Sequence, residues 1–227
     1  MALLGHGALA MWWDIAPEHR AEFEDWHTHE HFPERMGIAG FLRGSRWAAA
    51  DGGEGFFVLY ELAAHETLAS PPYLARLNAP SPWSTRMMPH HRNMVRSQCR
   101  VLESCGGALS RHALTVRLSP EEGNEDRLRI YLRELARALR SRRGTSAGHL
   151  LWHEAPSIAT TTEQKIRGGA DDAADGIFIA CGYERAALET LARVELSDIT
   201  LTAAGARPRS VQGLYTLSHT NSTDDVG

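Results

Sequence analysis

Apolar and polar positions alternate along the first half of the chain in a way that predicts strand, helix, two strands, helix and strand. The first helix should begin at Pro17, because proline is tolerated at the first helical position, and it should end at Pro33. Prolines also interrupt the second helical stretch, which should therefore form several short helices. The predicted strands are 7–15, 41–49, 56–62 and 97–103, and the helical stretches are 17–33 and 65–96.

The second half repeats this order after Cys105-Gly106-Gly107, which is the best candidate for a boundary. Its first helix has leucines at helical spacing on one side, and the polar stretch 157–175 should be partly loop. The predicted strands are 113–118, 150–154, 176–181 and 211–218, and the helices are 125–142 and 184–194.

Two successive β-α-β-β-α-β units indicate an α+β protein made of two tandem ferredoxin-like units. Each sheet has helices on one face only, and the sheet of the sister unit is the simplest cover for the other face. We therefore expect the units to pack sheet to sheet, as a dimer within one chain, with Trp12 and Trp13 on opposite faces of the first strand. The expected divisions are a first unit at 1–106, a second at 107–219 and a flexible tail at 220–227.

The 227 residues carry a formal net charge of −4, and 43% of them are hydrophobic, which is enough for ordinary cores. The charge argues against a nucleic-acid or anionic-membrane partner, since either would favour a basic face. No apolar run reaches the ~20 residues of a membrane span, and the first residues lack the basic region of a signal peptide. Three cysteines without CxxC spacing predict reduced thiols in a cytoplasmic protein.

Candidate chemistry concentrates at the end of the first predicted helix, in the sequence Trp-His-Thr-His-Glu-His at 26–31. At about 100° per residue, His27 and Glu30 point toward the interior, and His31 lies at the edge of that face. A carboxyl group beside aromatic rings should have a raised pKa, and a neighbouring imidazole could share its proton. The pattern favours a general acid–base pair, with His31 as the base, Glu30 as its orienter or the acid, and His27 as a further polar contact.

Two other interpretations of these residues stay open. The first is a structural network, because a histidine is favourable near a helix C-terminus and Glu30 could pair with Arg43 or Arg46. The second is a metal site, because His27 and His31 are four positions apart. No HExxH pattern or distant Cys/His cluster completes such a site, so we expect neither a metal nor a cofactor.

Other residues could complete a pocket around this helix end. The candidates for substrate contact are Trp26, Arg46, Tyr60, Trp83 and His90. Tyr60 could equally be a core residue with a bonded hydroxyl, and His90 could be a surface histidine. The first helix of the second half has no counterpart of the histidine cluster, which indicates one working pocket and one structural partner unit.

Several short sequences resemble the EthD-related members of the dimeric α/β-barrel superfamily. In the first half they are Asp25-Trp26, Glu30-His31-Phe32-Pro33-Glu34-Arg35, Gly40-Phe41-Leu42, Arg46, Leu59-Tyr60-Glu61-Leu62, Ser70-Pro71, Tyr73 and Pro82-Trp83. In the second half they are Thr162-Glu163-Gln164, Arg167-Gly168-Gly169 and Ala174-Asp175, as in tandem-repeat members. The resemblance implies the fold and leaves the activity open, because the superfamily includes cofactor-free monooxygenases, muconolactone-type isomerases, polyketide cyclases and haem enzymes. Similar proteins often carry Tyr at the position of His27.

These features favour a cofactor-independent enzyme acting on a small, largely apolar carbonyl or aromatic compound. Isomerisation, cyclisation or lyase chemistry would begin with proton abstraction by a side chain, since the sequence has no nucleotide, flavin or serine-nucleophile motif. One alternative is a small-molecule binding protein without turnover. The other is an oxygenase or haem-binding member of the same fold, with a histidine as axial ligand. The expected partner is a small molecule, with a homodimer as an option.

Overall fold

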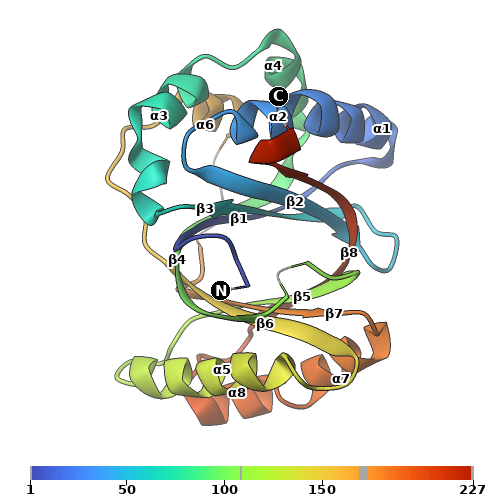
Figure 1. The fold of residues 1–227 in the computed structure, drawn as a ribbon, viewed down its shortest axis with the longest axis vertical. Helices are drawn as coiled ribbons and strands as arrows, with labels where there is room; N and C mark the ends of the chain where they lie inside the picture. Colours follow the sequence, from blue (N-terminus) through green and yellow to red (C-terminus); the bar gives the residue numbers. More distant parts are fainter. Residues whose placement is uncertain (1, 108, 169–172, 226–227) are drawn as a thin grey trace.

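The computed structural model describes residues 2–107, 109–168 and 173–225. The strands within these residues form one closed antiparallel barrel in the order β1-β3-β2-β8-β5-β7-β6-β4 (Figure 1). The strands are β1 (Gly7–Asp14), β2 (Phe41–Ala49), β3 (Gly55–Leu62), β4 (Arg92–Gly106), β5 (His112–Leu118), β6 (Thr145–His153), β7 (Gly176–Gly182) and β8 (Val211–Ser222).

Each half of the chain contributes four neighbouring strands to the barrel. The first half supplies β4-β1-β3-β2 and the second half supplies β8-β5-β7-β6, so both halves use the same internal order. β2 pairs with β8 and β4 pairs with β6, which joins the edge strands of the two sheets and closes the barrel. The predicted α+β architecture of two ferredoxin-like units facing each other is confirmed.

Helices cover the outer face of each half. In Figure 1, α1 to α4 lie above the barrel, and α5, α7 and α8 lie below it. α6 comes from the second half of the chain, yet it lies against α3 and η3 on the first half. The helical segments are α1 (Pro17–Trp26), η1 (His27–His31), α2 (Phe32–Met36), η2 (His65–Ala69), α3 (Pro71–Asn78), α4 (Pro82–Met87), η3 (Met88–His90), α5 (Glu125–Leu139), α6 (Thr162–Arg167), α7 (Arg185–Arg193), α8 (Asp198–Ala204) and η4 (Thr223–Asp225).

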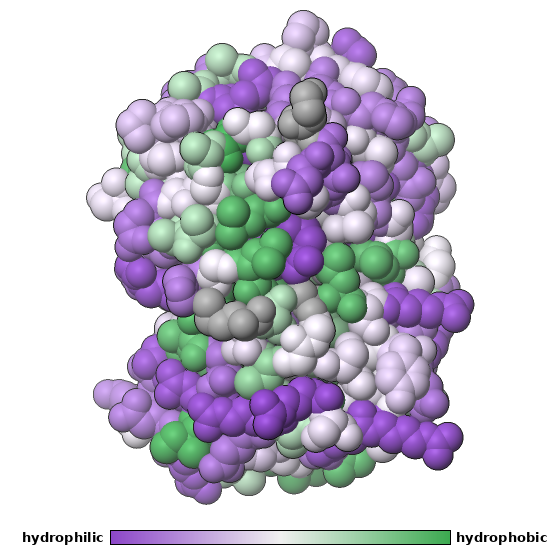
Figure 2. Space-filling view, viewed as in Figure 1, coloured by the Kyte–Doolittle hydropathy of each residue, from purple (hydrophilic) through white to green (hydrophobic). Residues whose placement is uncertain are grey.

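Strand alternation divides the apolar side chains among three cores. One core lies between the first-half helices and their sheet, a second is its counterpart in the other half, and a third fills the barrel. Trp13 belongs to the first core and Trp12 to the barrel core, so the prediction that they point to opposite faces of β1 is confirmed. Figure 2 shows apolar side chains at the waist between the two helix layers, whose visible surfaces are largely polar.

The first helical stretch does not end at Pro33, so that prediction was wrong. α1 continues into one turn of π-helix, η1, and then into α2, where Pro33 lies in the first turn. Proline cannot donate a hydrogen bond to the carbonyl four positions earlier, and its ring crowds that carbonyl. The wider π turn, in which the Phe32 N–H donates to the His27 carbonyl, carries the helix past this obstacle.

The end of the chain is more ordered than the sequence suggested. β8 continues to Ser222 and η4 follows it, so most of the expected flexible tail at 220–227 is folded; 226–227 lie outside the described residues. Thr220 faces Ser45 in the pairing of β8 with β2, and their hydroxyl oxygens lie 3.1 Å apart. The polar tail sequence is tolerated because one side of this end strand is exposed.

Two helices lie where the sequence pattern did not show them. α6 interrupts the polar stretch 157–175, and a capping box between Thr161 and Gln164 fixes its start. α8 begins at Ser197, whose hydroxyl accepts the Thr200 N–H. Both helices are too short for a clear apolar period, and their capping residues are the stronger sequence signal.

Candidate active site

Three histidines are buried together between the first-half helices and their sheet. His27, His31 and His91 are 1%, 3% and 7% exposed. The ring centroids of His27 and His31 lie 5.3 Å apart. Trp13 joins the third histidine to them, because its ring lies 5.8 Å from His27 and 5.0 Å from His91.

The π turn places two of these histidines on one face of the helix. His27 and His31 begin and end the turn, and both side chains point into the core. His29, between them, has 68% of its side chain exposed. Single π turns inside α-helices are frequent at functional sites, and here the turn follows from Pro33.

Aromatic rings surround the three imidazoles. The ring centroids of Trp26 and His31 are 4.6 Å apart, with an angle of 38° between the planes. Such a setting excludes water and fixes the orientation of each imidazole. The rings whose centroids lie between 4.4 and 5.9 Å from an imidazole centroid include Trp13, Phe23, Trp26 and Phe32.

Burial keeps His27 and His31 neutral. Loss of solvation lowers the pKa of His27 well below its ordinary value of 6.5, and the charge of Arg46 adds to the shift. The pKa of His31 is lowered in the same way, first by burial and then by the charge of Arg35. At neutral pH each ring therefore has one N–H and one nitrogen lone pair, which is the form that accepts a proton.

His91 is held by the backbone at the end of η3. Its Nδ1 lies 3.0 Å from the Met88 carbonyl, so Nδ1 carries the proton and Nε2 the lone pair. Burial lowers the pKa of His91 to about 3, and the charge of Arg167 adds to the shift. This imidazole is also neutral at physiological pH.

Several buried polar groups at this site have atoms with no hydrogen-bond partner among the described residues, and we call five of these groups the buried polar cluster. The atoms are Nδ1 of His27, Nδ1 of His31, the hydroxyl of Tyr60, one terminal nitrogen of Arg35 and Nε of Arg167. Single atoms of this kind occur elsewhere, but folded proteins leave few of them. Burial raises the pKa of Tyr60, so its hydroxyl stays protonated and can donate. A bound molecule or water is expected to supply the missing partners.

α6 brings the second half of the chain to this site. Glu163 accepts a 2.6 Å hydrogen bond from Arg35 on α2, and its other oxygen lies 3.2 Å from Arg167 without hydrogen-bond geometry. Ile166 packs on the first core, and the Thr162 N–H donates to Asn78 on α3. No local sequence pattern indicates that this segment crosses to the first half of the fold.

A pocket of about 360 Å³ lies beside Arg167. The charge of Arg167 contributes to the pKa shifts of all three buried histidines and of Tyr60, but none of these four residues lines the pocket. The volume falls in the range of small-ligand sites. The pocket is lined by Met94, Arg96, Thr160, Gln164, Lys165, Arg167 and Gly168.

Glu30 has other partners than the histidine expected from the sequence. Its Oε1 accepts hydrogen bonds from the Trp26 indole at 3.1 Å, from Ser84 at 3.3 Å and from Ser81. No hydrogen bond joins Glu30 to His31 in the part of the chain that the structure describes. Glu30 therefore links the π turn to α4 by hydrogen bonds. It also orients the Trp26 indole, which packs against His31.

Arg46 holds the end of α1 to the barrel. It is 4% exposed and donates to the Glu24 carbonyl, to the Thr28 hydroxyl and to Ser218 on β8. Burial lowers the pKa of Arg46 to about 10. The guanidinium nitrogens of Arg46 donate to protein atoms, so we assign Arg46 a supporting role for the turn that carries His27.

Trp83 and His90 lie toward the surface. The Trp83 indole donates to Glu22 at 3.3 Å, and the His90 ring stacks on His19 at 3.7 Å. Neither residue lines the pocket beside Arg167. The next residue, His91, is the one that turns inward.

The sequence interpretation did not select Arg35, Glu163 or Arg167 as site residues, and of the pair His90-His91, a possible lid or pocket wall, it selected His90. All of them lay in stretches that the resemblance had marked or next to a candidate: His91 follows His90, and the other three belong to the matching segments. The missing information was their distance in space, which no local pattern contains. Trp13 was placed on a strand face but not beside the histidines.

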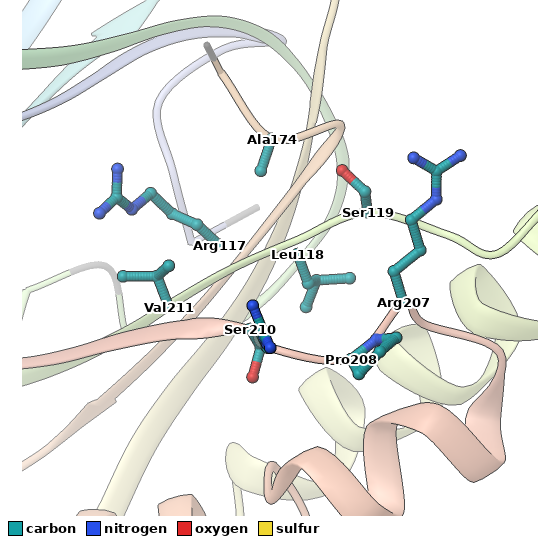
Figure 3. Close-up of a pocket in the computed structure, with 9 residues that line it drawn as sticks. Arg117, Leu118, Ser119, Ala174, Arg207, Pro208, Ser210 and Val211 are labelled. Atoms are coloured by element: carbon teal, nitrogen blue, oxygen red, sulfur yellow. The ribbon is translucent and has the colours of Figure 1, made fainter. Parts of the chain in front are cut away.

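A second pocket, of about 260 Å³, is formed entirely by the second half of the chain (Figure 3). Arg117 and Arg207 lie on its opposite sides, and their guanidinium groups point away from each other. It is therefore a poor match for a single anionic group. Within residues 2–107, 109–168 and 173–225, no group of three or more His, Cys, Asp or Glu side chains is arranged to hold a metal ion.

Comparison with known proteins shows the fold. No protein-family model and no curated protein sequence matches the chain. An anthrone oxidase-like protein superposes with a TM-score of 0.67 at 12% identity, covering 97% of this chain and 94% of that one. A candidate monooxygenase from Fusobacterium nucleatum gives 0.63 at 7% identity, with 96% and 95% covered, and a heme-binding protein from Thermus thermophilus gives 0.50 at 9%, with 96% and 92% covered. The chain has the dimeric α/β-barrel fold.

Proposed function

We propose that the protein is a cofactor-independent enzyme that binds a small, largely apolar carbonyl or aromatic compound and removes a proton from it. The main support is the buried polar cluster, in which neutral imidazoles and unpaired donors are buried in one region of the first half. Of this cluster, Arg167 lines the neighbouring pocket of ligand size, and His27, His31, Tyr60 and Arg35 do not. The aromatic rings around the imidazoles suit a flat apolar substrate.

His31 is the proposed base. Burial disfavours the imidazolium form, so the ring keeps a free lone pair at ordinary pH. An enolate formed beside it supplies the negative charge that stabilises the imidazolium. Trp26 keeps the ring in place, and His27, 5.3 Å away, is a second polar contact.

Tyr60 and Arg35 are the proposed donors to the substrate oxygen. The hydroxyl of Tyr60 and one terminal nitrogen of Arg35 lack acceptors among the described residues. The charge of Arg35 acts on the pKa of both His31 and Tyr60, and all three side chains are buried on the first half of the chain. Donors aimed at a developing oxyanion are a large source of rate enhancement.

The remaining candidates support this site indirectly. Glu30 fixes Trp26, and Arg46 fixes the turn that carries His27. We retain the EthD-related tandem group as the proposed relationship, supported by the position of Glu163 and Arg167 beside the first-unit site.

Oxygenation is a second candidate, favoured by the likeness to anthrone oxidase-like and monooxygenase proteins. After proton removal, molecular oxygen would bond to the substrate carbanion to give a hydroperoxide. Loss of water would then leave a new carbonyl, so that one CH₂ group and one O₂ give one C=O group and one water.

Deuterium exchange tests the proton step without knowledge of the natural substrate. Anthrone, an aromatic ketone with an acidic CH₂ group, is incubated with protein in D₂O under argon, and loss of the CH₂ signal is followed by NMR against a protein-free blank. We expect catalysed exchange that falls by about 10²–10⁴-fold in His31→Gln, the contribution of a general base. His29→Gln, from the same turn but exposed, is the matched control.

The outcomes separate the rival functions. Binding of anthrone without exchange would favour a binding protein, and exchange unaffected by His31→Gln would remove His31 as the base. Uptake of one O₂ per anthrone in air would select the oxygenase. A Soret band in purified protein would favour a haem-binding role instead.

We keep a reducing, cytoplasmic setting as part of the proposal. Cys99 and Cys105 are free thiols, and no helix within the described ranges is long and apolar enough to cross a membrane. The chain closes its barrel by itself, so a homodimer is not needed to complete the site.

A further inference from the structure

We propose that the pocket beside Arg167 binds a carboxylate carried by the aromatic or unsaturated substrate. This inference rests on the proposed function, because it names the substrate class for the same site. It follows from the charges of the groups that line and adjoin the pocket.

Two buried guanidinium groups share one carboxylate. Arg35 and Glu163 have 3% and 1% of their side chains exposed, and Arg167 has 10%. Glu163 makes its 2.6 Å hydrogen bond to Arg35 and only an ion-pair contact, at 3.2 Å, to Arg167. Buried charges are normally paired, so Arg167 is left with less compensation than its burial requires.

Arg96 adds a third guanidinium on the pocket wall. It donates to the Tyr73 hydroxyl at 3.0 Å, which is a neutral acceptor. Its charge acts on Arg167, and burial lowers the pKa of Arg167 in spite of Glu163. The nearby histidines are neutral, so they do not offset the positive charge of these arginines. The described part of the pocket is therefore strongly electropositive.

The shape of these groups selects a carboxylate. Nε of Arg167 has no acceptor among the described residues, and guanidinium groups bind planar carboxylates through paired N–H donors. Met94 provides an apolar wall on the same pocket and belongs to the core that contains Trp26. An anionic end and an apolar body in one ligand match this arrangement.

Two probes of the same shape test the charge preference. 9-Anthracenecarboxylate and its uncharged amide are titrated against the intact protein, and binding is followed by quenching of tryptophan fluorescence. We expect the carboxylate to bind at least about tenfold more tightly, as for one charge-assisted hydrogen bond. Arg167→Gln should abolish the preference, and Arg96→Gln should reduce it. Arg193→Gln, an exposed arginine of α7, should leave it unchanged.

Equal binding of the two probes, no binding of either one, or a preference that survives Arg167→Gln would each overturn the inference. Arg167→Gln should still fold, because Glu163 keeps its bond to Arg35, and thermal unfolding verifies this. A carboxylate preference that is absent from the unmodified protein, together with intact, His31-dependent deuterium exchange, would refute the anion site alone. Loss of exchange with an intact preference would refute the base alone.

Discussion

Arg35 and Glu163 lie 128 positions apart in the chain and form an ion pair of 2.6 Å in which both side chains are almost completely buried. The pair joins α2 of the first unit to α6 of the second half. The two halves are therefore not simply a working unit and a scaffold. The second half provides most of the residues that line the pocket beside Arg167, and the first half adds Met94 and Arg96.

Removing the negative charge of this pair should strongly destabilise the protein. In Glu163→Gln, two buried guanidinium groups lose their shared carboxylate, and breaking a buried ion pair costs about 3–5 kcal/mol. The free energy of unfolding in urea measures this loss. Glu189→Gln, which breaks the exposed pair with Arg185, is the control and should cost at most about 1 kcal/mol. Equal stability of Glu163→Gln and the unmodified protein would show that other groups compensate the charges of Arg35 and Arg167.

Much of the fold could be predicted because its signals are local. Apolar alternation marked the strands, and the repeated order of elements marked the two units. The opposite placement of Trp12 and Trp13 followed from the two-residue period of a strand. The burial of His27 followed from helical spacing, although the π turn was not anticipated.

The composition of the site could not be predicted in the same way. Nothing local to Glu163 shows that α6 crosses to the first unit, and the choice of His91 over His90 depends on how η3 packs. The partners of Glu30 depend on α4, some fifty positions later in the chain, as in the Ser81 contact with a separation of 51. Long-range packing decides each of these cases.

Acid should weaken the fold through His91. Its folded pKa is about 3, below the 6.5 of a solvated imidazole, so between these values the unfolded chain binds a proton that the folded protein does not. The free energy of unfolding therefore falls as the pH falls below 6.5, by about 1.4 kcal/mol per pH unit for this residue. We expect His91→Gln to remove this part of the slope in urea titrations between pH 7.5 and 5.

The same measurement contains its own control. Above pH 7 the imidazole is neutral in both states, so the stabilities of His91→Gln and the unmodified protein should differ by a constant amount. Parallel curves below pH 6.5 would mean that His91 is charged in the folded protein, against the burial argument.

Gly44 should be sensitive to a single added methyl group. A Cβ there would lie 2.4 Å from the Phe32 ring and 2.9 Å from the Tyr60 ring. Phe32 in turn lies 4.4 Å from His27, so the displacement reaches the site. We expect Gly44→Ala to cost about 1–3 kcal/mol and to slow deuterium exchange. Gly107→Ala is the control, because the added carbon meets no described atom within 4 Å. It should change neither the stability nor the rate of deuterium exchange.

Glu30 provides a way to tell a positioning residue from a reacting one. Its Oε1 accepts hydrogen bonds from Trp26, Ser81 and Ser84, and a glutamine oxygen can accept the same bonds. Glu30→Gln should therefore keep most of the exchange activity, although charged acceptors form stronger bonds.

Glu30→Ala should behave differently, because it leaves the buried Trp26 indole with fewer acceptors and frees the π turn from α4. The loss of hydrogen bonds to a charged group should cost about 1.5–3 kcal/mol each at most, and exchange should slow as the Trp26 ring loses its fixed position against His31. Measuring kcat for both variants separates the roles. If Glu30→Gln loses as much activity as His31→Gln while its stability is unchanged, the carboxylate itself takes part in proton transfer. If only Glu30→Ala is impaired, Glu30 acts through Trp26.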